Sequence, residues 1–241
     1  KLNEERGGAL ELALAALARA WRIDVSDEES LAKLVTLGSK LRAWNELVTT
    51  LEEGAAAAPH QDLAGALWAR AAEIHEQHRA DLPRAIIAWR HVQEARPDDM
   101  LPLSSLDRLL ARTNRIEELV KVVERRAELT EDTNARIVLL HRVAALYEEA
   151  LTDPQAAITA YKNVLGVDDA DLEALDALER LYRGTNGDPR ELVQTIERKI
   201  EIITDPPTRR ELRLAAAEVH EKQLSDVYQA IGQLTAILDE Y

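Results

Sequence analysis

Apolar residues recur along the chain at the spacing of one face of an α-helix. One such stripe lies in 133–151 and consists of Leu139, Leu140, Val143, Ala144, Leu146 and Tyr147. A second stripe lies in 154–166 and consists of Ala157, Ile158, Tyr161, Val164 and Leu165. Asp153 suits an N-cap and Pro154 suits the first helical position, so the connecting turn is short. Two amphipathic helices joined this closely are predicted to pack antiparallel.

The helix pair recurs along the chain with a period of about 72 residues. A shift of 72 residues places Ala144 on Ala72 and Ala157 on Ala85, and a third copy lies 73 residues further on. The intervening segments repeat too, since Glu-Leu-Val sequences begin at Glu46, Glu118 and Glu191. We therefore predict a four-helix repeat within a single domain 1–241, whose copies span 7–59 (partial), 60–130, 131–204 and 205–241 (partial).

Thirteen helices are predicted, beginning on the second helix of a repeat. Their expected ranges are 7–22, 27–41, 43–55, 60–79, 83–95, 99–112, 115–129, 133–151, 154–166, 170–183, 189–203, 208–224 and 226–240. Ser26, Asp188 and Thr208 each stand three residues before a Glu, the spacing of a capping box or its Asp equivalent. No linker is long enough to separate independent domains.

The small and large residues of the helix pair are similar to those of a known repeat family. Leu140-x2-Val143-Ala144-x2-Tyr147, followed by Ala157, resembles the tetratricopeptide repeat. The pattern departs from the family in the third helices, where a charged residue replaces the expected small one, and in a turn longer by about one residue. The resemblance implies an all-α fold, a right-handed α-solenoid of antiparallel helix pairs. It also implies a scaffold for protein complexes or a concave groove for peptides.

Composition narrows the classes of partner. The chain has 241 residues, of which 46% are hydrophobic and 31% charged, with a formal net charge of −14. This balance indicates a globular protein and argues against nucleic acid or an anionic membrane as the partner. It favours a basic partner, although a merely solvated acidic surface explains it equally. No apolar run is long enough to span a bilayer, and there are no cysteines.

The ends of the chain suggest a larger protein. The sequence starts with Lys1 and shows no signal-peptide pattern, which predicts a fragment or a processed chain. The Ala-, Leu- and Arg-rich composition suggests a bacterial source, and no compartment is assigned. The last helix is expected to expose Ile231, Leu234, Ile237 and Leu238. We expect further repeats, another domain or a partner to cover this apolar end.

Five charged residues are the candidate binding residues. Acidic residues recur at one place in the first helices, and arginines recur at one place in the third helices, on a face that the family geometry turns inward. They are Glu76, Glu148, Glu221, Arg108 and Arg180. One interpretation is a groove that recognises a charged peptide. The other is a set of interhelical ion pairs on a solvated face.

Other candidate chemistry has a structural explanation in the sequence. His75, His78 and His91 lack the further ligands that a metal site needs, and His75 occupies the place of Tyr147, at the edge of the core. Acidic pairs such as Asp98-Asp99 and Asp168-Asp169 stand where helices start and are expected to cap them. We expect no metal, cofactor or catalytic residue.

Two functions are compatible with this sequence. The first is a non-catalytic protein- or peptide-binding scaffold in a larger assembly. The alternative is a regulatory sensor domain within a signalling protein, which would need an enclosed pocket for a small ligand or peptide. An enzyme would need perturbed carboxylates or histidines clustered in one cavity, and the sequence shows no such cluster.

Overall fold

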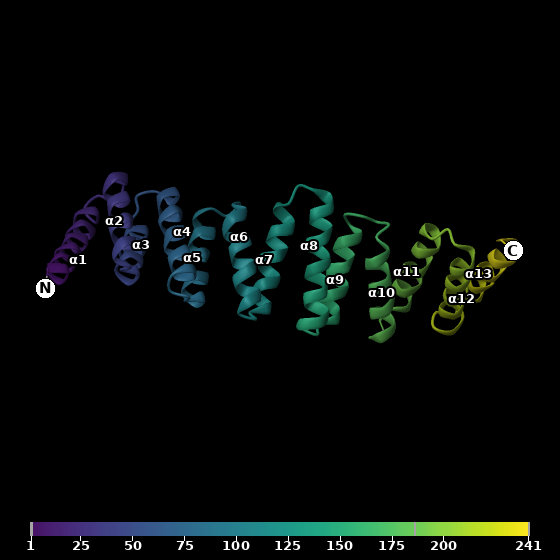
Figure 1. Cartoon of the computed structure of the whole chain (residues 1–241). Coiled ribbons are helices and arrows are strands. Elements are labelled where there is room, and N and C mark those ends of the chain that lie inside the picture. Colours follow the sequence, from purple (N-terminus) through teal and green to yellow (C-terminus); the bar gives the residue numbers. More distant parts are fainter. Residues whose placement is uncertain (1, 186, 241) are drawn as a thin grey trace. The chain divides into compact units, whose positions relative to one another are not determined.

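The fold is all-α, as predicted. The structure is a computed structural model that describes residues 2–185 and 187–240, and these form thirteen α-helices, one π-helical turn and no strands (Figure 1). The elements are α1 (Leu2–Trp21), α2 (Glu28–Leu41), α3 (Trp44–Ala56), α4 (Gln61–Gln77), α5 (Leu82–Ala95), α6 (Met100–Arg112), α7 (Ile116–Leu129), α8 (Thr133–Ala145), η1 (Leu146–Ala150), α9 (Pro154–Leu165), α10 (Leu172–Gly184), α11 (Pro189–Ile202), α12 (Pro206–Lys222) and α13 (Val227–Glu240).

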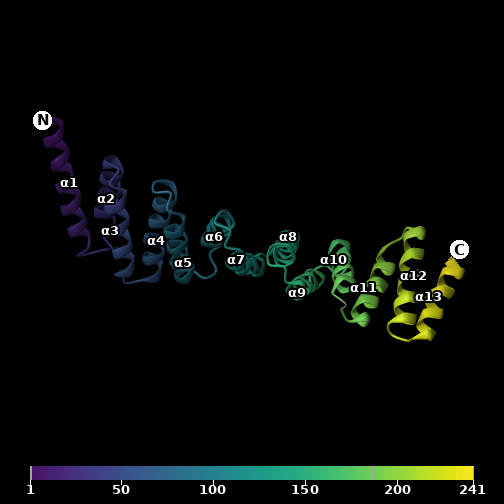
Figure 2. The same ribbon diagram turned by 90° about the horizontal axis from the view of Figure 1, so that it is seen from below.

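The helices group into two compact units. The N-terminal unit is Lys1–Val122 and the C-terminal unit is Val123–Tyr241, so the boundary falls within α7. In the N-terminal unit α1 to α6 pack in sequence order, and in the C-terminal unit α8 to α13 do the same (Figures 1 and 2). Each unit is thus a stretch of stacked helix pairs, the solenoid architecture expected from the repeat. The single-domain organisation stays a prediction.

Small residues mark the closest helix contacts, as the tetratricopeptide-like spacing predicted. Ala72 on α4 and Ala85 on α5 are fully buried, and so are Ala144 on α8 and Ala157 on α9. A side chain without atoms beyond Cβ lets two helices approach closely, and larger neighbours fill the flanks. In the third helices leucines fill the core instead, and Asp107 of α6 is itself buried.

The backbone repeats with the same period as the sequence. Left-handed residues follow the first helices at Ala80, Thr152 and Ser225, and follow the third helices at Arg42 and Asn114. Beyond each of the first three, an Asp N–H donates to a carbonyl six residues earlier, from Asp81 to His75 (2.8 Å), Asp153 to Tyr147 (2.9 Å) and Asp226 to His220 (2.8 Å). These widened ends produce the longer turn. They also correct the single helix predicted for 133–151, because its last turn is the π-helix η1.

Helix starts confirm some predicted caps and correct others. Asp153 and Asp188 cap α9 and α11 as expected. The cap of α2 is Asp27 and not Ser26, and the cap of α12 is Asp205 and not Thr208. In both cases a carboxylate one to three residues away accepts from the free N–H groups of the first turn.

The acidic pairs divide in the same way. Asp99 caps α6, whereas α10 is capped by Asp171 and not by Asp168 or Asp169. Asp168 instead accepts from the backbone N–H of Ala170, 3.0 Å away, within the preceding turn. A helix-capping role was therefore correct for only one of the two pairs.

Candidate functional site

Four of the five candidate residues form two equivalent ion pairs. In the N-terminal unit the guanidinium of Arg108 on α6 donates to both carboxylate oxygens of Glu76 on α4, with Nη2 2.8 Å from Oε2. Arg112 lies 3.7 Å from the same carboxylate. The hydrogen bond from Arg108 lowers the pKa of Glu76, and the bond to Glu76 raises the pKa of Arg108. Both groups therefore stay charged at neutral pH.

The C-terminal unit repeats this arrangement. Arg180 on α10 donates to both carboxylate oxygens of Glu148 in η1, with Nη2 3.1 Å from Oε2. The hydroxyl of Tyr161 on α9 donates to Glu148 Oε2 across 3.3 Å. Hydrogen bonding to Arg180 lowers the pKa of Glu148, while burial and the Glu148 charge raise the pKa of Tyr161 to about 12. The carboxylate oxygens of Glu148 are thus engaged within the protein, whereas Arg180 is 61% exposed.

Glu221, the third acidic candidate, does not share this geometry. It is exposed at the end of α12, and no Arg pairs with it within residues 2–185 and 187–240. The structure thus brings together Glu76 with Arg108 and Glu148 with Arg180, and leaves Glu221 apart.

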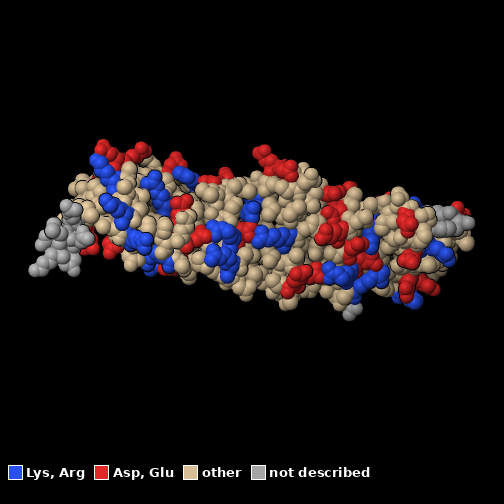
Figure 3. Space-filling view, viewed as in Figure 1, with Lys and Arg blue, Asp and Glu red and all other residues tan. Residues whose placement is uncertain are grey.

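The pair Glu148–Arg180 forms one wall of an open hollow in the C-terminal unit. This acidic hollow has a volume of about 650 Å³ and lies between α8, η1, α9 and α10. It is lined by His141, Ala145, Glu148, Glu149, Tyr161, Glu173, Asp176, Ala177 and Arg180. Acidic side chains gather over this part of the surface in Figure 3. Four carboxylates therefore share the hollow with one guanidinium and one imidazole.

The N-terminal unit shows which of these charges the architecture requires. A shift of 72 residues places Glu148 on Glu76 and Arg180 on Arg108, so the ion pair is common to both units. The same shift replaces the other three carboxylates, and Glu149, Glu173 and Asp176 fall on Gln77, Leu101 and Ser104. The acidity of the hollow is therefore not needed to join the helices.

The residues Glu149, Glu173 and Asp176 were missed by sequence reasoning, which looked for positions shared between repeats. The signal that could have found them is the opposite one, a position where the copies differ in charge. Asp176 also holds Lys199 of α11, 2.7 Å away, and Glu173 lies 3.9 Å from His141. Glu149 and Glu173 are both exposed to solvent.

The histidines have structural partners. His75 is buried and bonds Glu52 through Nε2 (2.8 Å), and its Nδ1 lies 3.1 Å from a guanidinium nitrogen of Arg79. Tyr147 and His220 occupy the equivalent place and bond Glu124 (3.1 Å) and Glu197 (3.2 Å). Each partner stands 23 residues earlier, so this is a repeated contact between the first and fourth helices.

Two further histidines stack on tryptophans. His78 lies over Trp44 with ring centroids 3.8 Å apart, and His91 lies over Trp68 at 4.3 Å. Trp21 and Trp89 are buried in the core. Within the part of the chain that the structure describes, no three His, Asp or Glu side chains gather in a way that could hold a metal ion.

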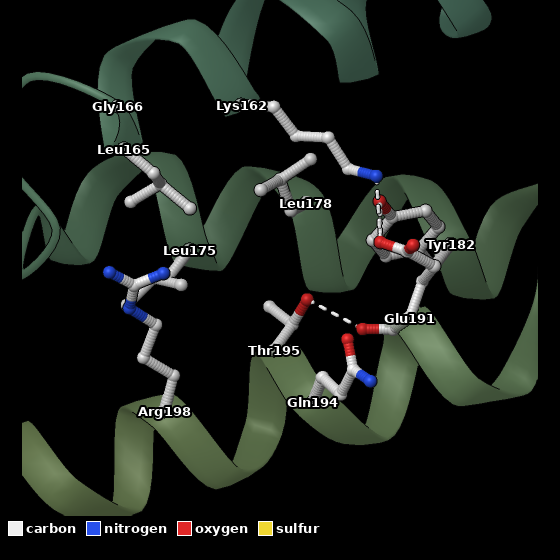
Figure 4. Close-up of a pocket in the computed structure, with 10 residues that line it drawn as sticks. All are labelled: Lys162, Leu165, Gly166, Leu175, Leu178, Tyr182, Glu191, Gln194, Thr195 and Arg198. Atoms are coloured by element: carbon white, nitrogen blue, oxygen red, sulfur yellow. Dashed lines mark hydrogen bonds and ion pairs between the residues drawn. The ribbon is translucent and has the colours of Figure 1, made fainter.

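A second hollow in the C-terminal unit, of about 330 Å³, lies between α9, α10 and α11. Figure 4 shows Lys162 of α9 reaching across it to Glu191 of α11. The Lys162 ammonium is 2.7 Å from the Glu191 carboxylate, which also accepts from the hydroxyl of Tyr182 (3.2 Å). Hydrogen bonding to Glu191 raises the pKa of Lys162. Here the protein fills its own hollow with a basic side chain.

The exposed face of α13 is partly as predicted. Ile231, Leu234 and Leu238 are exposed, and Tyr228 is 90% exposed, whereas Ile237 is half-buried. No helix in the described ranges has the length and apolarity needed to cross a membrane. That something covers this face stays a prediction.

Comparisons with known proteins find similarity at the level of structure alone. No family model matches the chain, and no curated protein matches it. YrrB, described as a TPR protein with an unusual peptide-binding site, is 13% identical, with a TM-score of 0.38 over 72% of this chain and 84% of YrrB. MamA from Desulfovibrio magneticus RS-1 is 14% identical, with a TM-score of 0.35 over 73% of this chain and 93% of that one.

A tetratricopeptide repeat protein from Parabacteroides merdae is 15% identical, with a TM-score of 0.39 over 88% of this chain and 79% of that protein. All three TM-scores lie below 0.5, so the function of this chain is argued from its own residues. The buried alanine contacts, the paired helices and the 72-residue period give the chain a tetratricopeptide-like architecture.

Proposed function

We propose that the protein is a non-catalytic scaffold whose acidic hollow binds a basic segment of a protein partner. The observation that carries this proposal is the difference between the two units. The ion pair of the hollow recurs in both units and serves the architecture, whereas the added carboxylates Glu149, Glu173 and Asp176 occur in one. Charge that the fold does not need is available for recognition.

The electrostatics of the hollow support binding over catalysis. The pKa of Glu148 is lowered by its bond to Arg180, and that of Tyr161 is raised to about 12, so neither group exchanges a proton near neutral pH. Exposed, negatively charged Glu149 and Glu173 attract a cationic segment over a distance of about a Debye length, roughly 8 Å at physiological salt. The hollow is open to solvent, which suits a peptide chain better than an enclosed small ligand.

The test is a double charge reversal, Glu149→Lys with Glu173→Lys. An array of unrelated peptides graded in net charge is probed with the wild-type protein and with the variant. We expect the wild type to retain Lys- and Arg-rich peptides, more weakly as salt rises, and the variant to lose them. Far-UV circular dichroism confirms that the variant is folded.

The matched control reverses two exposed carboxylates of the same unit that lie outside the hollow, Glu201→Lys with Glu211→Lys. The net charge changes equally, so only a local effect separates the two variants. Equal loss of peptide binding in both would show that the overall charge acts and not the hollow. Retention of binding in the Glu149 and Glu173 variant would refute the proposal.

A further inference from the structure

A third hollow, in the N-terminal unit, occupies the place that Lys162 fills in the C-terminal unit. This N-terminal hollow has a volume of about 400 Å³ and lies between α1, α2 and α3. It is lined by Glu11, Leu14, Ala15, Ala18, Leu34, Leu41, Ala43, Glu46, Leu47 and Thr50. A second, a third and a fourth helix of the repeat form its walls, as they do around Lys162 and Glu191.

The repeat identifies the equivalent residues. Glu46, Glu118 and Glu191 open the same Glu-Leu-Val sequence on α3, α7 and α11. Opposite them, on the second helices, the repeat places Ala18, Arg90 and Lys162. The local geometry agrees, because the hydroxyls of Thr50 and Thr195 both donate over 2.8 Å to the backbone carbonyl of the Glu four residues earlier.

Two of the three copies supply a cation to this Glu. Lys162 pairs with Glu191 at 2.7 Å, and Arg90 pairs with Glu118, which also accepts from Arg115 at 2.6 Å. In the first copy the basic residue is replaced by Ala18. Among the side chains that the structure describes, no Lys or Arg forms an ion pair with Glu46, which is exposed at the rim of the hollow.

The remaining lining fits the shape and chemistry of a basic side chain. Leu14, Leu34 and Leu47 are buried and form an apolar floor. Glu11 and Glu46 are exposed and carry negative charge at the rim. Lys and Arg lay their alkyl stems along apolar surface and keep the charged head near carboxylates and water. A purely apolar side chain would use the floor and leave the carboxylates without a partner.

We propose that the N-terminal hollow receives one Lys or Arg side chain from a protein partner, in the place that Arg90 and Lys162 fill in the other copies. The proposal goes beyond the acidic hollow and does not depend on it. The two hollows lie in different units and are lined by different residues.

The first experiment lets the protein occupy its own hollow. Ala18→Lys is compared with Ala18→Met, each alone and combined with Glu46→Gln, and the unfolding of the N-terminal unit is followed. We expect Ala18→Lys to favour the folded state, and Glu46→Gln to reduce this gain by about two- to five-fold in the folding equilibrium, the range for exposed ion pairs. The Ala18→Met variant should show no such coupling. Equal behaviour of Lys and Met would overturn the proposal.

The second experiment measures binding by NMR of leucine methyl groups. The probes are three capped peptides that differ in one residue, Lys, Arg or norleucine, the last having the alkyl stem without the charge. The Lys and Arg peptides should shift the methyl signals of Leu14, Leu34 and Leu47 more strongly than the norleucine peptide. Ala18→Lys should abolish the shifts and Glu46→Gln should weaken them.

Two control variants should leave this binding unchanged. Glu73→Gln removes an exposed carboxylate of the same unit outside the hollow. The Glu149 and Glu173 double reversal disables the acidic hollow, so failure of one proposal is distinguishable from failure of the other. No shift with any peptide, equal shifts with norleucine, or unchanged binding in Ala18→Lys would each overturn the inference.

Discussion

Gly54 on α3 is the position where the smallest change is expected to have the clearest effect. A Cβ atom built on Gly54 would stand 2.2 Å from Cη2 and 2.5 Å from Cζ3 of Trp21. Carbon atoms in contact lie about 3.5–4.0 Å apart, so the indole ring of Trp21 would have to move. Trp21 is 1% exposed and belongs to the core of the N-terminal unit, where a large ring has little room.

Two effects of Gly54→Ala oppose each other. Alanine is favoured over glycine inside a helix by about 1 kcal/mol. Overpacking a close-packed core costs about 1–3 kcal/mol. Because the contact is far shorter than van der Waals distance and its partner is a fully buried ring, we expect a net destabilisation of about 1–2 kcal/mol.

The control is Gly232→Ala in α13. No heavy atom lies within 4 Å of the Cβ position at Gly232, so the helical preference acts alone. We expect this variant to be more stable than the wild type by about 0.5–1 kcal/mol. The two substitutions are chemically identical and are expected to have opposite signs.

The aromatic residues allow the two units to be followed separately. All four tryptophans lie between residues 21 and 89, in the N-terminal unit, so tryptophan fluorescence during urea denaturation reports that unit. Far-UV circular dichroism follows both units and serves for Gly232→Ala. In a Trp21→Leu background the clash is absent, and Gly54→Ala should no longer destabilise. A higher denaturation midpoint for Gly54→Ala in the wild-type background would refute the reasoning.

Three further predictions concern the C-terminal unit. Ala144→Leu should overpack the contact with α9 and lower the urea midpoint, corresponding to about 1–3 kcal/mol, and an unchanged midpoint would contradict the close contact. Thr152→Gly should raise thermal stability by about 0.5–1 kcal/mol, because a β-branched residue is strained at φ of 51°, whereas Thr152→Ala should not. Glu148→Gln should destabilise by up to about 1 kcal/mol at pH 7. The pKa of Glu148 is lowered in the folded state, so its contribution is present above its ordinary value of 4.5 and is lost as the pH falls through the folded value. Denaturation of wild type and variant should therefore converge in acid, and a constant difference would exclude the ion pair with Arg180.

The candidate site shows how far the charge pattern could be interpreted. The sequence placed Glu148 and Arg180 on facing helices because each recurs at a fixed place in the repeat. It left open whether they face a ligand or each other, since that depends on the separation of η1 and α10. The structure shows the two side chains paired, and it adds Glu149, Glu173 and Asp176, which recur nowhere else.

The sequence by itself determined the local structure and the period. Apolar residues at helical spacing, prolines and aspartates at helix starts, and small residues at Ala144 and Ala157 are local signals, and the helices follow them closely. Only the tertiary structure decided what depends on three helices at once. The ring of Trp21 over Gly54, the paired oxygens of Glu148 and the vacant place opposite Glu46 each join side chains distant in sequence. Such contacts are fixed by how helices pack, which no single amphipathic stripe specifies.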